Sequence, residues 1–208
     1  GPPSAAISAF SPVDPEVARI CENAAETLAA AGWDITGDVP DFTTAMETFH
    51  VIRAASFAAG MSELLDSNRD LLKPDIIWNI EKGLKQSGTQ LAQAERDRGA
   101  LYHAMAEFYE THDLLLTPTA CMPPFPVEWR CPEELGGETF ENYMEWLRLP
   151  CVLSLTGCPV LSLPVGVTPN GLPVCMQFCG PYGGEAQMIS AAWQAEQMFD
   201  MAATVPRD

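Results

Sequence analysis

The chain has 208 residues, 47% of them hydrophobic, and its 28 acidic against 11 basic side chains give a formal net charge of −17. Such a surface repels nucleic acid and anionic lipid, which argues against partners of either kind. No run approaches the roughly 18 to 20 apolar residues that a membrane helix needs, and no secretory leader opens the chain. Gly1-Pro2 is typical of the scar of a cleaved purification tag, so residues 3–208 are expected to form a single domain or an incomplete one.

The opening of the chain predicts a strand, a helix and a second strand. Ala5–Ala9 has the composition of a short strand. Asp14-Pro15 is typical of a helix N-cap followed by proline at the first helical position, and Gly32 is expected to end that helix. Residues 33–39 are then predicted to form a strand.

The middle of the chain predicts helices. A second helix is expected from Thr44 to Leu65, with Thr44 and Glu47 at the spacing of a capping box. Residues 74–81 predict a short helical turn, and a third long helix opens at Thr89. Two histidines lie at the outer end of this third helix, where a structural or solvated role is the usual one: His103 and His112.

The last part of the chain alternates between strands and helices. The expected elements are a buried strand (Asp113–Leu116), a polar acidic insertion (Glu133–Glu141), a helix (Tyr143–Leu155), strands (Val160–Val165 and Pro173–Cys179) and a final helix (Glu185–Met198). In the last strand, even-numbered and odd-numbered side chains are expected on opposite faces. The alternation along the whole chain predicts an α/β fold with a mixed β-sheet flanked by helices.

Cysteine content bears on metal binding and on the cellular compartment. None of the seven cysteines forms a C-x-x-C pair, and no histidine lies at ligand spacing beside them, so we expect neither a metal site nor another cofactor. An odd number of cysteines without a secretory leader is typical of reduced thiols, which predicts a cytoplasmic protein. Most of these cysteines are expected to be small core residues.

Several short motifs resemble the C-terminal region of amidase-signature hydrolases, which cleave amides and some esters on a large α/β sandwich. The motifs, which together extend over nearly the whole chain, are Ser11–Val17, Asp113–Thr119, Gly157-Cys158-Pro159, Ser162–Gly166, Gly171–Val174, Gln177 and Gly180. The glycines and prolines among them fit turns and strand ends, so they are expected to fix the fold rather than the chemistry.

The chain departs from this family at the residues that carry catalysis. The resemblance implies a serine nucleophile, a second serine with a cis peptide bond and a lysine base, with both serines in a Gly/Ser-rich stretch. The chain contains no Ser-Ser dipeptide, and none of its three lysines has the required context: Lys73, Lys82 and Lys85. We therefore expect this chain to contain no catalytic residue and to be the C-terminal part of an amidase, either a fragment or one piece of a split enzyme.

Two other chemistries would use residues that are present. Cys121 is the best-placed cysteine nucleophile, with His112 nine residues before it, but the intervening strand is expected to carry the two apart. A carboxylate pair could come from an acidic cluster that instead has the composition of a solvated surface: Glu133, Glu134, Glu138 and Glu141.

The loop after the buried strand is stiff, apolar and poor in hydrogen-bond donors, and it follows a strand end, where sites in α/β sheets lie. We expect it to form one wall of a substrate pocket; a rigid loop packed on its own sheet is the alternative. The residues predicted to bind substrate are Thr117, Thr119, Cys121, Met122, Phe125 and Trp129.

The resemblance implies hydrolysis of a small-molecule carboxamide through an acyl-serine intermediate. The expected partner is the missing N-terminal amidase part or a separate partner chain, and a homo-oligomer is also compatible. The alternative is a non-catalytic subunit or decayed relative that acts as an interaction module. Neither the amide nor the oligomeric state follows from the sequence.

Overall fold

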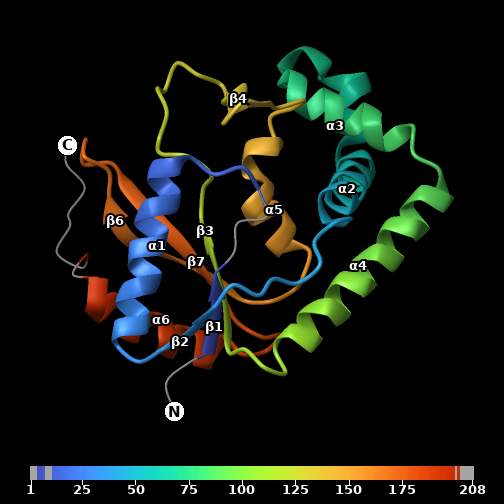
Figure 1. Ribbon diagram of the computed structural model, residues 1–208. Coiled ribbons are helices and arrows are strands. Elements are labelled where there is room, and N and C mark those ends of the chain that lie inside the picture. The colour runs from blue at the N-terminus through green and yellow to red at the C-terminus, as the bar shows by residue number, and fades with distance from the viewer. Residues whose placement is uncertain (1–3, 8–10, 200, 202–208) are drawn as a thin grey trace. The chain divides into compact units, whose positions relative to one another are not determined.

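The computed structural model describes residues 4–7, 11–199 and 201, which divide into two compact units (Figure 1). The first comprises the described parts of Gly1–Asp41 and Ala104–Asp208, and the second comprises Phe42–His103. The prediction of a single or incomplete domain stays a prediction. Within the described ranges, no helix combines the length and apolar character that a membrane crossing requires.

The first unit is built on a five-stranded mixed sheet (Figure 1). Its order is β2 (Asp34–Thr36), β1 (Ser4–Ile7), β3 (Leu114–Pro118), β7 (Pro173–Cys179) and β6 (Val160–Val167). The strand β1 runs parallel to β2 and β3, whereas β7 is antiparallel to β3 and to β6. The predicted mixed α/β fold is therefore confirmed.

Helix α1 (Pro15–Ala30) connects β1 to β2 and begins and ends at the predicted residues. The Asp14 side chain accepts a hydrogen bond of 2.8 Å from the backbone N–H of Glu16, and Pro15 occupies the first helical position. At the other end, Gly32 has a φ of 97°. This left-handed conformation lets Gly32 N–H bond the Ala29 carbonyl and Trp33 N–H bond the Leu28 carbonyl, which closes the helix as a Schellman motif.

The main core lies between one face of this sheet and the helices α1 and α6 (Glu185–Phe199). Val174, Met176 and Phe178 of β7 all point into it, which confirms the predicted alternation along that strand. The sequence of α6 predicts a buried apolar stripe of Met188, Ile189, Ala192, Trp193 and Met198, and this prediction is only partly correct. Its Met188 and Ala192 are buried, but Ile189 and Trp193 are 53% and 62% exposed.

A small second cluster lies beside the loop that follows β3. It is formed by Cys121, Leu135 and Leu149, which come from the loop, from a hairpin and from α5 (Arg148–Ser154). The hairpin consists of β4 (Glu134–Leu135) and β5 (Glu138–Thr139), so the predicted acidic insertion has a regular structure.

The helix predicted over Tyr143–Leu155 is shorter in the structure. A 3-10 turn, η2 (Glu145–Leu147), precedes α5, and the α-helix begins only at Arg148. Pro150 explains this boundary, because proline fits an α-helix only in the first turn, where its missing N–H has no intrahelical partner.

The second unit consists of helices. It contains α2 (Ala45–Ser67), the 3-10 turn η1 (Arg69–Leu71), α3 (Pro74–Leu84) and the first part of α4 (Gly88–Phe108). The capping box predicted at Thr44 is wrong: its backbone is in the helical region, and its side chain makes no capping hydrogen bond. The turn predicted over residues 74–81 is a longer helix.

Several strand boundaries also differ from those predicted. β2 covers only Asp34–Thr36, β3 extends to Pro118, and β6 extends to Val167. β1 ends at Ile7, and the predicted strand's last residues, Ser8 and Ala9, lie outside the described residues, as does the presumed tag scar.

Gly166 on β6 offers a test of the packing between this strand and α1. A Cβ atom added to Gly166 would lie 2.7 Å from the Cγ2 methyl of buried Ile20, a branched side chain that cannot move aside easily. We expect Gly166→Ala to lower the free energy of unfolding by about 1–3 kcal/mol through overpacking. Urea denaturation measures this loss. Gly37→Ala is the control, since a Cβ there meets nothing within 4 Å, and an equal change in both variants would contradict the assigned contact.

Candidate functional site

The loop that follows β3 is tied to the sheet and to α1 by backbone hydrogen bonds. Thr119 N–H donates to the Cys175 carbonyl at 2.9 Å, which continues the pairing of β3 with β7 past Pro118. Two residues further on, the Cys121 carbonyl accepts a hydrogen bond of 2.7 Å from Asp14 N–H, just before α1. The two bonds therefore fix the backbone just before the proline-rich part of the loop begins. The prolines themselves have no N–H group and so need no hydrogen-bond acceptors.

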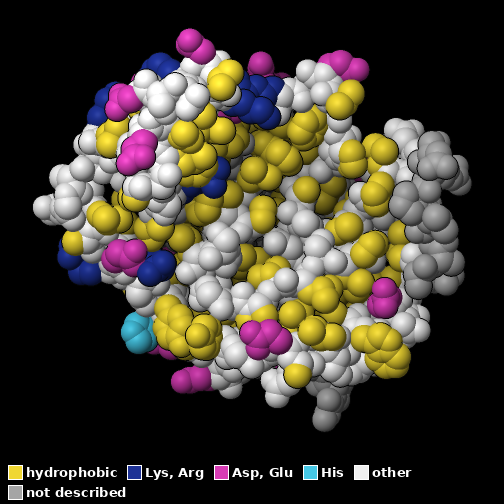
Figure 2. Space-filling model, turned by 180° about the vertical axis from the view of Figure 1, so that it is seen from behind, with side chains coloured by type: hydrophobic (Ala, Val, Ile, Leu, Met, Phe, Trp, Pro, Cys, Tyr) yellow, Lys and Arg dark blue, Asp and Glu magenta, His cyan; other side chains and the backbone are white. Residues whose placement is uncertain are grey.

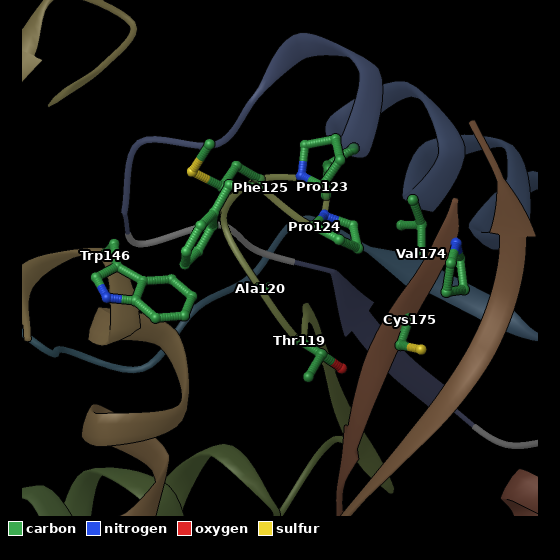
Figure 3. A pocket seen from close by; sticks show the side chains of 11 residues that line it. Thr119, Ala120, Pro123, Pro124, Phe125, Trp146, Val174 and Cys175 are labelled. Atoms are coloured by element: carbon green, nitrogen blue, oxygen red, sulfur yellow. The ribbon is translucent and has the colours of Figure 1, made fainter. Parts of the chain in front are cut away.

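A cavity of about 230 Å³ lies between this loop, β7, the start of α1 and η2 (Figure 3). The rings of Phe125 and Trp146 meet edge to face at one side, with centroids 5.2 Å apart and an interplanar angle of 85°. Figure 3 shows Val174 and Cys175 on the opposite side, carried by β7. The lining residues are Val17, Thr119, Ala120, Met122, Pro123, Pro124, Phe125, Trp146, Pro173, Val174 and Cys175.

Three of the six residues predicted to bind substrate line this cavity, namely Thr119, Met122 and Phe125. The other three lie around it. Thr117 is fully buried in β3, and Cys121 is buried with its thiol donating to the Trp146 carbonyl at 3.1 Å. Trp129 is 52% exposed and stacks on Phe125, with ring centroids 6.3 Å apart, so it supports a lining residue from outside.

Sequence reasoning missed the contributions of other elements to this cavity. Val17 comes from α1, Trp146 from η2, and Pro173, Val174 and Cys175 from β7. A prediction that β3 pairs with β7 would have placed the β7 residues beside the loop. Nothing in the local sequence signals Trp146, because its position depends on where the chain returns after the hairpin.

A row of polar side chains crosses the sheet face opposite α1 and α6. Gln177 on β7 donates from Nε2 to Thr117 Oγ1 at 3.0 Å and to the Pro118 carbonyl at 3.3 Å. At the more exposed end of the row, the hydroxyl oxygens of Thr119 and Ser162 are 2.7 Å apart, and Cys175 hydrogen-bonds Ser162. Because Thr117, Gln177 and Ser162 are register partners on three neighbouring strands, these bonds hold β3, β7 and β6 together at the cavity.

The environment of Cys121 does not support its use as a nucleophile. Burial raises the pKa of this thiol to about 11, so it stays protonated near neutral pH. The ring of His112 is engaged elsewhere: it stacks on Phe108 at 4.3 Å, and its Nε2 lies 3.1 Å from Thr36 Oγ1 and 3.3 Å from Asp38 Oδ2. These contacts give His112 a structural role at the end of α4.

The acidic cluster does not form a general acid–base pair either. Four of its glutamates are exposed in or next to the hairpin: Glu133, Glu134, Glu138 and Glu141. Glu138 accepts a hydrogen bond from Arg148, as does Glu145, at 3.3 and 2.7 Å respectively. Exposed carboxylates of this kind, one of them paired with an arginine, are typical of a solvated surface and not of a general acid–base pair.

Comparison with known proteins decides the family. The sequence profile described as Amidase matches residues 5–189, which is most of the chain. The chain belongs to the amidase family. This confirms the resemblance drawn from the sequence motifs, and the shared fold explains why glycine and proline positions carried that resemblance.

Curated amidase relatives are longer than this chain. It is 26% identical over 200 residues to an acylamidase from Rhodococcus erythropolis, an alignment that covers 94% of this chain and 42% of the relative. It is 25% identical over 194 residues to a 2-amino-5-chloromuconic acid deaminase from Comamonas testosteroni, covering 90% of this chain and 40% of that relative. This amidase chain thus spans less than half the length of these relatives.

Solved amidase structures share its fold. A bacterial aryl acylamidase of the amidase-signature family superposes with a TM-score of 0.79 at 20% identity, covering 99% of this chain and 46% of that one. A second structure, described as an amidase, gives 0.85 at 20% identity, covering 95% and 46%. At this identity the likeness establishes the fold of the amidase chain and not its substrate.

The buried bond between Gln177 and Thr117 can be tested by removing its acceptor. Thr117→Val keeps the side-chain shape but leaves the Gln177 amide with the longer bond to Pro118, so we expect a loss of about 1–2 kcal/mol in unfolding free energy. Thr119→Val is the matched control, because its hydroxyl bond to Ser162 is exposed and should cost less than about 0.5 kcal/mol. Urea denaturation of both variants measures the difference, and equal losses would contradict it.

Proposed function

We propose that this chain is the C-terminal part of an amidase that hydrolyses carboxamide bonds, and that the cavity beside the loop after β3 holds the acyl group of the substrate. Membership of the amidase family over residues 5–189 carries the proposal. Its support is the share of the relatives that the chain covers, 42% of the acylamidase, together with the absence of a Ser-Ser dipeptide from its sequence.

In this proposal the reaction proceeds through an acyl-serine intermediate whose nucleophile, base and oxyanion donors lie in the remainder of the enzyme. This chain would contribute binding and positioning. Its strands β3, β7 and β6 form a rigid base, and the proline loop presents Met122 and Phe125 with little loss of side-chain or backbone entropy. A preformed wall of this kind orients the acyl group without an ordering step.

The lining of the cavity favours an uncharged, apolar acyl group. None of the described residues that line it is charged, and the polar side-chain groups among them are the Thr119 hydroxyl, the Cys175 thiol and the Trp146 indole N–H. An anionic acyl group would meet no cation in the lining and would approach a chain with a net charge of −17. The edge-to-face rings of Phe125 and Trp146 offer good packing to an aromatic or branched acyl group.

The surface supports a larger assembly with the remaining amidase part or with a partner chain. Among the described strands, β6 has a hydrogen-bonded neighbour on one side only. Large apolar side chains are exposed on β6, on the turns before and after β7 and on α6: Val160, Val167, Leu172, Tyr182, Ile189 and Trp193. Figure 2 shows apolar side chains at many points of the surface seen there. In our proposal part of this surface is covered in the complete enzyme, which we place in the cytoplasm.

The proposal predicts that the isolated 208 residues are inactive. Purified chain should hydrolyse neither simple amides nor p-nitrophenyl esters, and a serine-directed fluorophosphonate should label it no more than a heat-denatured control. Labelling of the native chain above that control would contradict the assignment of the nucleophile to another part. If the gene has no upstream in-frame Gly/Ser-rich segment with Ser-Ser, the non-catalytic interaction module becomes the better account.

Phe125→Ala tests the pocket in the complete enzyme. Removing this wall should lower kcat/KM for an amide with a bulky apolar acyl group relative to acetamide by about 10- to 200-fold, which corresponds to roughly 1–3 kcal/mol of lost contact. Its melting temperature should change little, since Phe125 is only half-buried.

Two outcomes of this experiment separate a pocket from a scaffold. Val127→Ala is the control, because Val127 is 93% exposed on the same loop and lines no part of the cavity, so it should leave the substrate ratio unchanged. A large drop in the melting temperature of Phe125→Ala with an unchanged substrate ratio would show that the loop is scaffold.

A further inference from the structure

Two cysteines lie together at the point where the chain enters β6. Cys179, the last residue of β7, is the register partner of Val160, and Gly180 N–H bonds the Pro159 carbonyl at 3.0 Å. Cys158 precedes Val160 by two positions, so it lies diagonally across from Cys179. The two side chains interact closely enough for each to shift the pKa of the other.

The two thiols differ in their exposure to solvent and in the direction of their pKa shifts. Cys158 is partly exposed, whereas Cys179 is fully buried. The backbone N–H of Cys158 donates to the Thr156 hydroxyl oxygen at 3.1 Å, and that hydroxyl donates to the Leu153 carbonyl at 2.7 Å. Hydrogen bonding, first of all from Cys179, lowers the pKa of Cys158 to about 7, while the same bond and burial raise the pKa of Cys179.

The other cysteines whose thiols are perturbed lack this arrangement. Burial raises the pKa of Cys21 to about 12 and that of Cys121 to about 11, and burial also raises the pKa of Cys175. A thiolate, not a thiol, reacts with peroxides, and it must be reachable from solvent. Cys158 meets both conditions and has a second cysteine, Cys179, on the adjacent segment.

We propose that Cys158 is a hydroperoxide-sensitive thiol that forms an intramolecular disulfide with Cys179. In the first step the Cys158 thiolate attacks the terminal oxygen of a hydroperoxide, the O–O bond breaks, and sulfenic acid forms while the alcohol or water leaves. In the second step the Cys179 sulfur attacks the Cys158 sulfur, the S–O bond breaks, and the Cys179 proton leaves with the hydroxide as water. Two thiols and one hydroperoxide thus give one disulfide, one alcohol and one water.

This modification site is independent of the proposed amidase activity. The pairing of β6 with β7 and the bond between Gly180 and Pro159 hold the two residues on adjacent segments of the backbone. The buried end of the pair is held in place, because the Tyr109 hydroxyl donates to the Cys179 carbonyl at 2.9 Å. The covalent link would fasten the start of β6 to the end of β7.

The test is to treat the folded, reduced chain with hydrogen peroxide, block the remaining thiols under denaturing conditions, and map the products by mass spectrometry. Chymotrypsin is the appropriate protease. The sequence has no Lys or Arg between Arg148 and Arg207, so trypsin would leave both cysteines in one peptide, whereas leucines and Phe178 lie between them. We expect loss of two of the seven thiols and a crosslinked peptide pair that contains Cys158 and Cys179.

Three variants complete the experiment. Cys158→Ser should abolish the disulfide, and Cys179→Ala should leave Cys158 as a sulfenic acid that dimedone traps. Cys131→Ser is the matched control, because Cys131 is also partly exposed, and it should behave as the native chain does. Iodoacetamide should also label Cys158 faster than Cys175 at neutral pH, because hydrogen bonding lowers the pKa of Cys158 whereas burial raises that of Cys175.

Retention of all seven thiols after peroxide treatment would overturn the proposal, as would a disulfide that involves any other cysteine. If Cys179→Ala fails to fold, the peptide map of the native chain and the Cys158→Ser variant decide the question between them.

Discussion

The antiparallel pairing of β3 with β7 is the contact on which the described sheet and its cavity depend. It joins segments about 60 residues apart in the chain, and it brings the loop after Pro118 against Cys175. The side-chain bond between Gln177 and Thr117 reinforces this pairing inside the sheet, where no water competes for the amide. Without this pairing, neither the proline loop nor the strand that faces it would have a fixed position.

The two faces of the sheet differ in polarity. One face is apolar and is covered by α1 and α6, so burial of Leu116, Met176 and Phe178 supplies the main hydrophobic stabilisation. The other face carries hydroxyl, amide and thiol groups, which bond one another across the strands. This division keeps these polar groups out of the apolar core and places Thr119 and Cys175 at the cavity, whose lining also includes Val17 and Val174 from the core side.

The sequence predicted the parts of the fold that depend on local chemistry. The Asp14 cap, Gly32 and the alternation along β7 follow from backbone and side-chain geometry within a few residues. The family followed from turn motifs. Errors arose where tertiary contacts decide: α6 exposes Ile189 and Trp193 despite a helical apolar pattern. Half of the predicted site residues line the cavity, but Val17 and Trp146 could not be found, since their approach depends on packing between distant segments.

The β4–β5 hairpin connects a solvent-exposed turn to the wall of the cavity. Its turn residues, Gly136 and Gly137, have φ values of 62° and 87° and are exposed, whereas the neighbouring Leu135 is buried against Cys121. The thiol of Cys121 in turn bonds the carbonyl of Trp146, a residue of the cavity wall. The turn of the hairpin is therefore in solvent, while its buried Leu135 packs against the residue that bonds the cavity wall. A fluorophore attached at the turn would therefore be linked through Leu135 and Cys121 to the cavity wall without occupying the cavity itself.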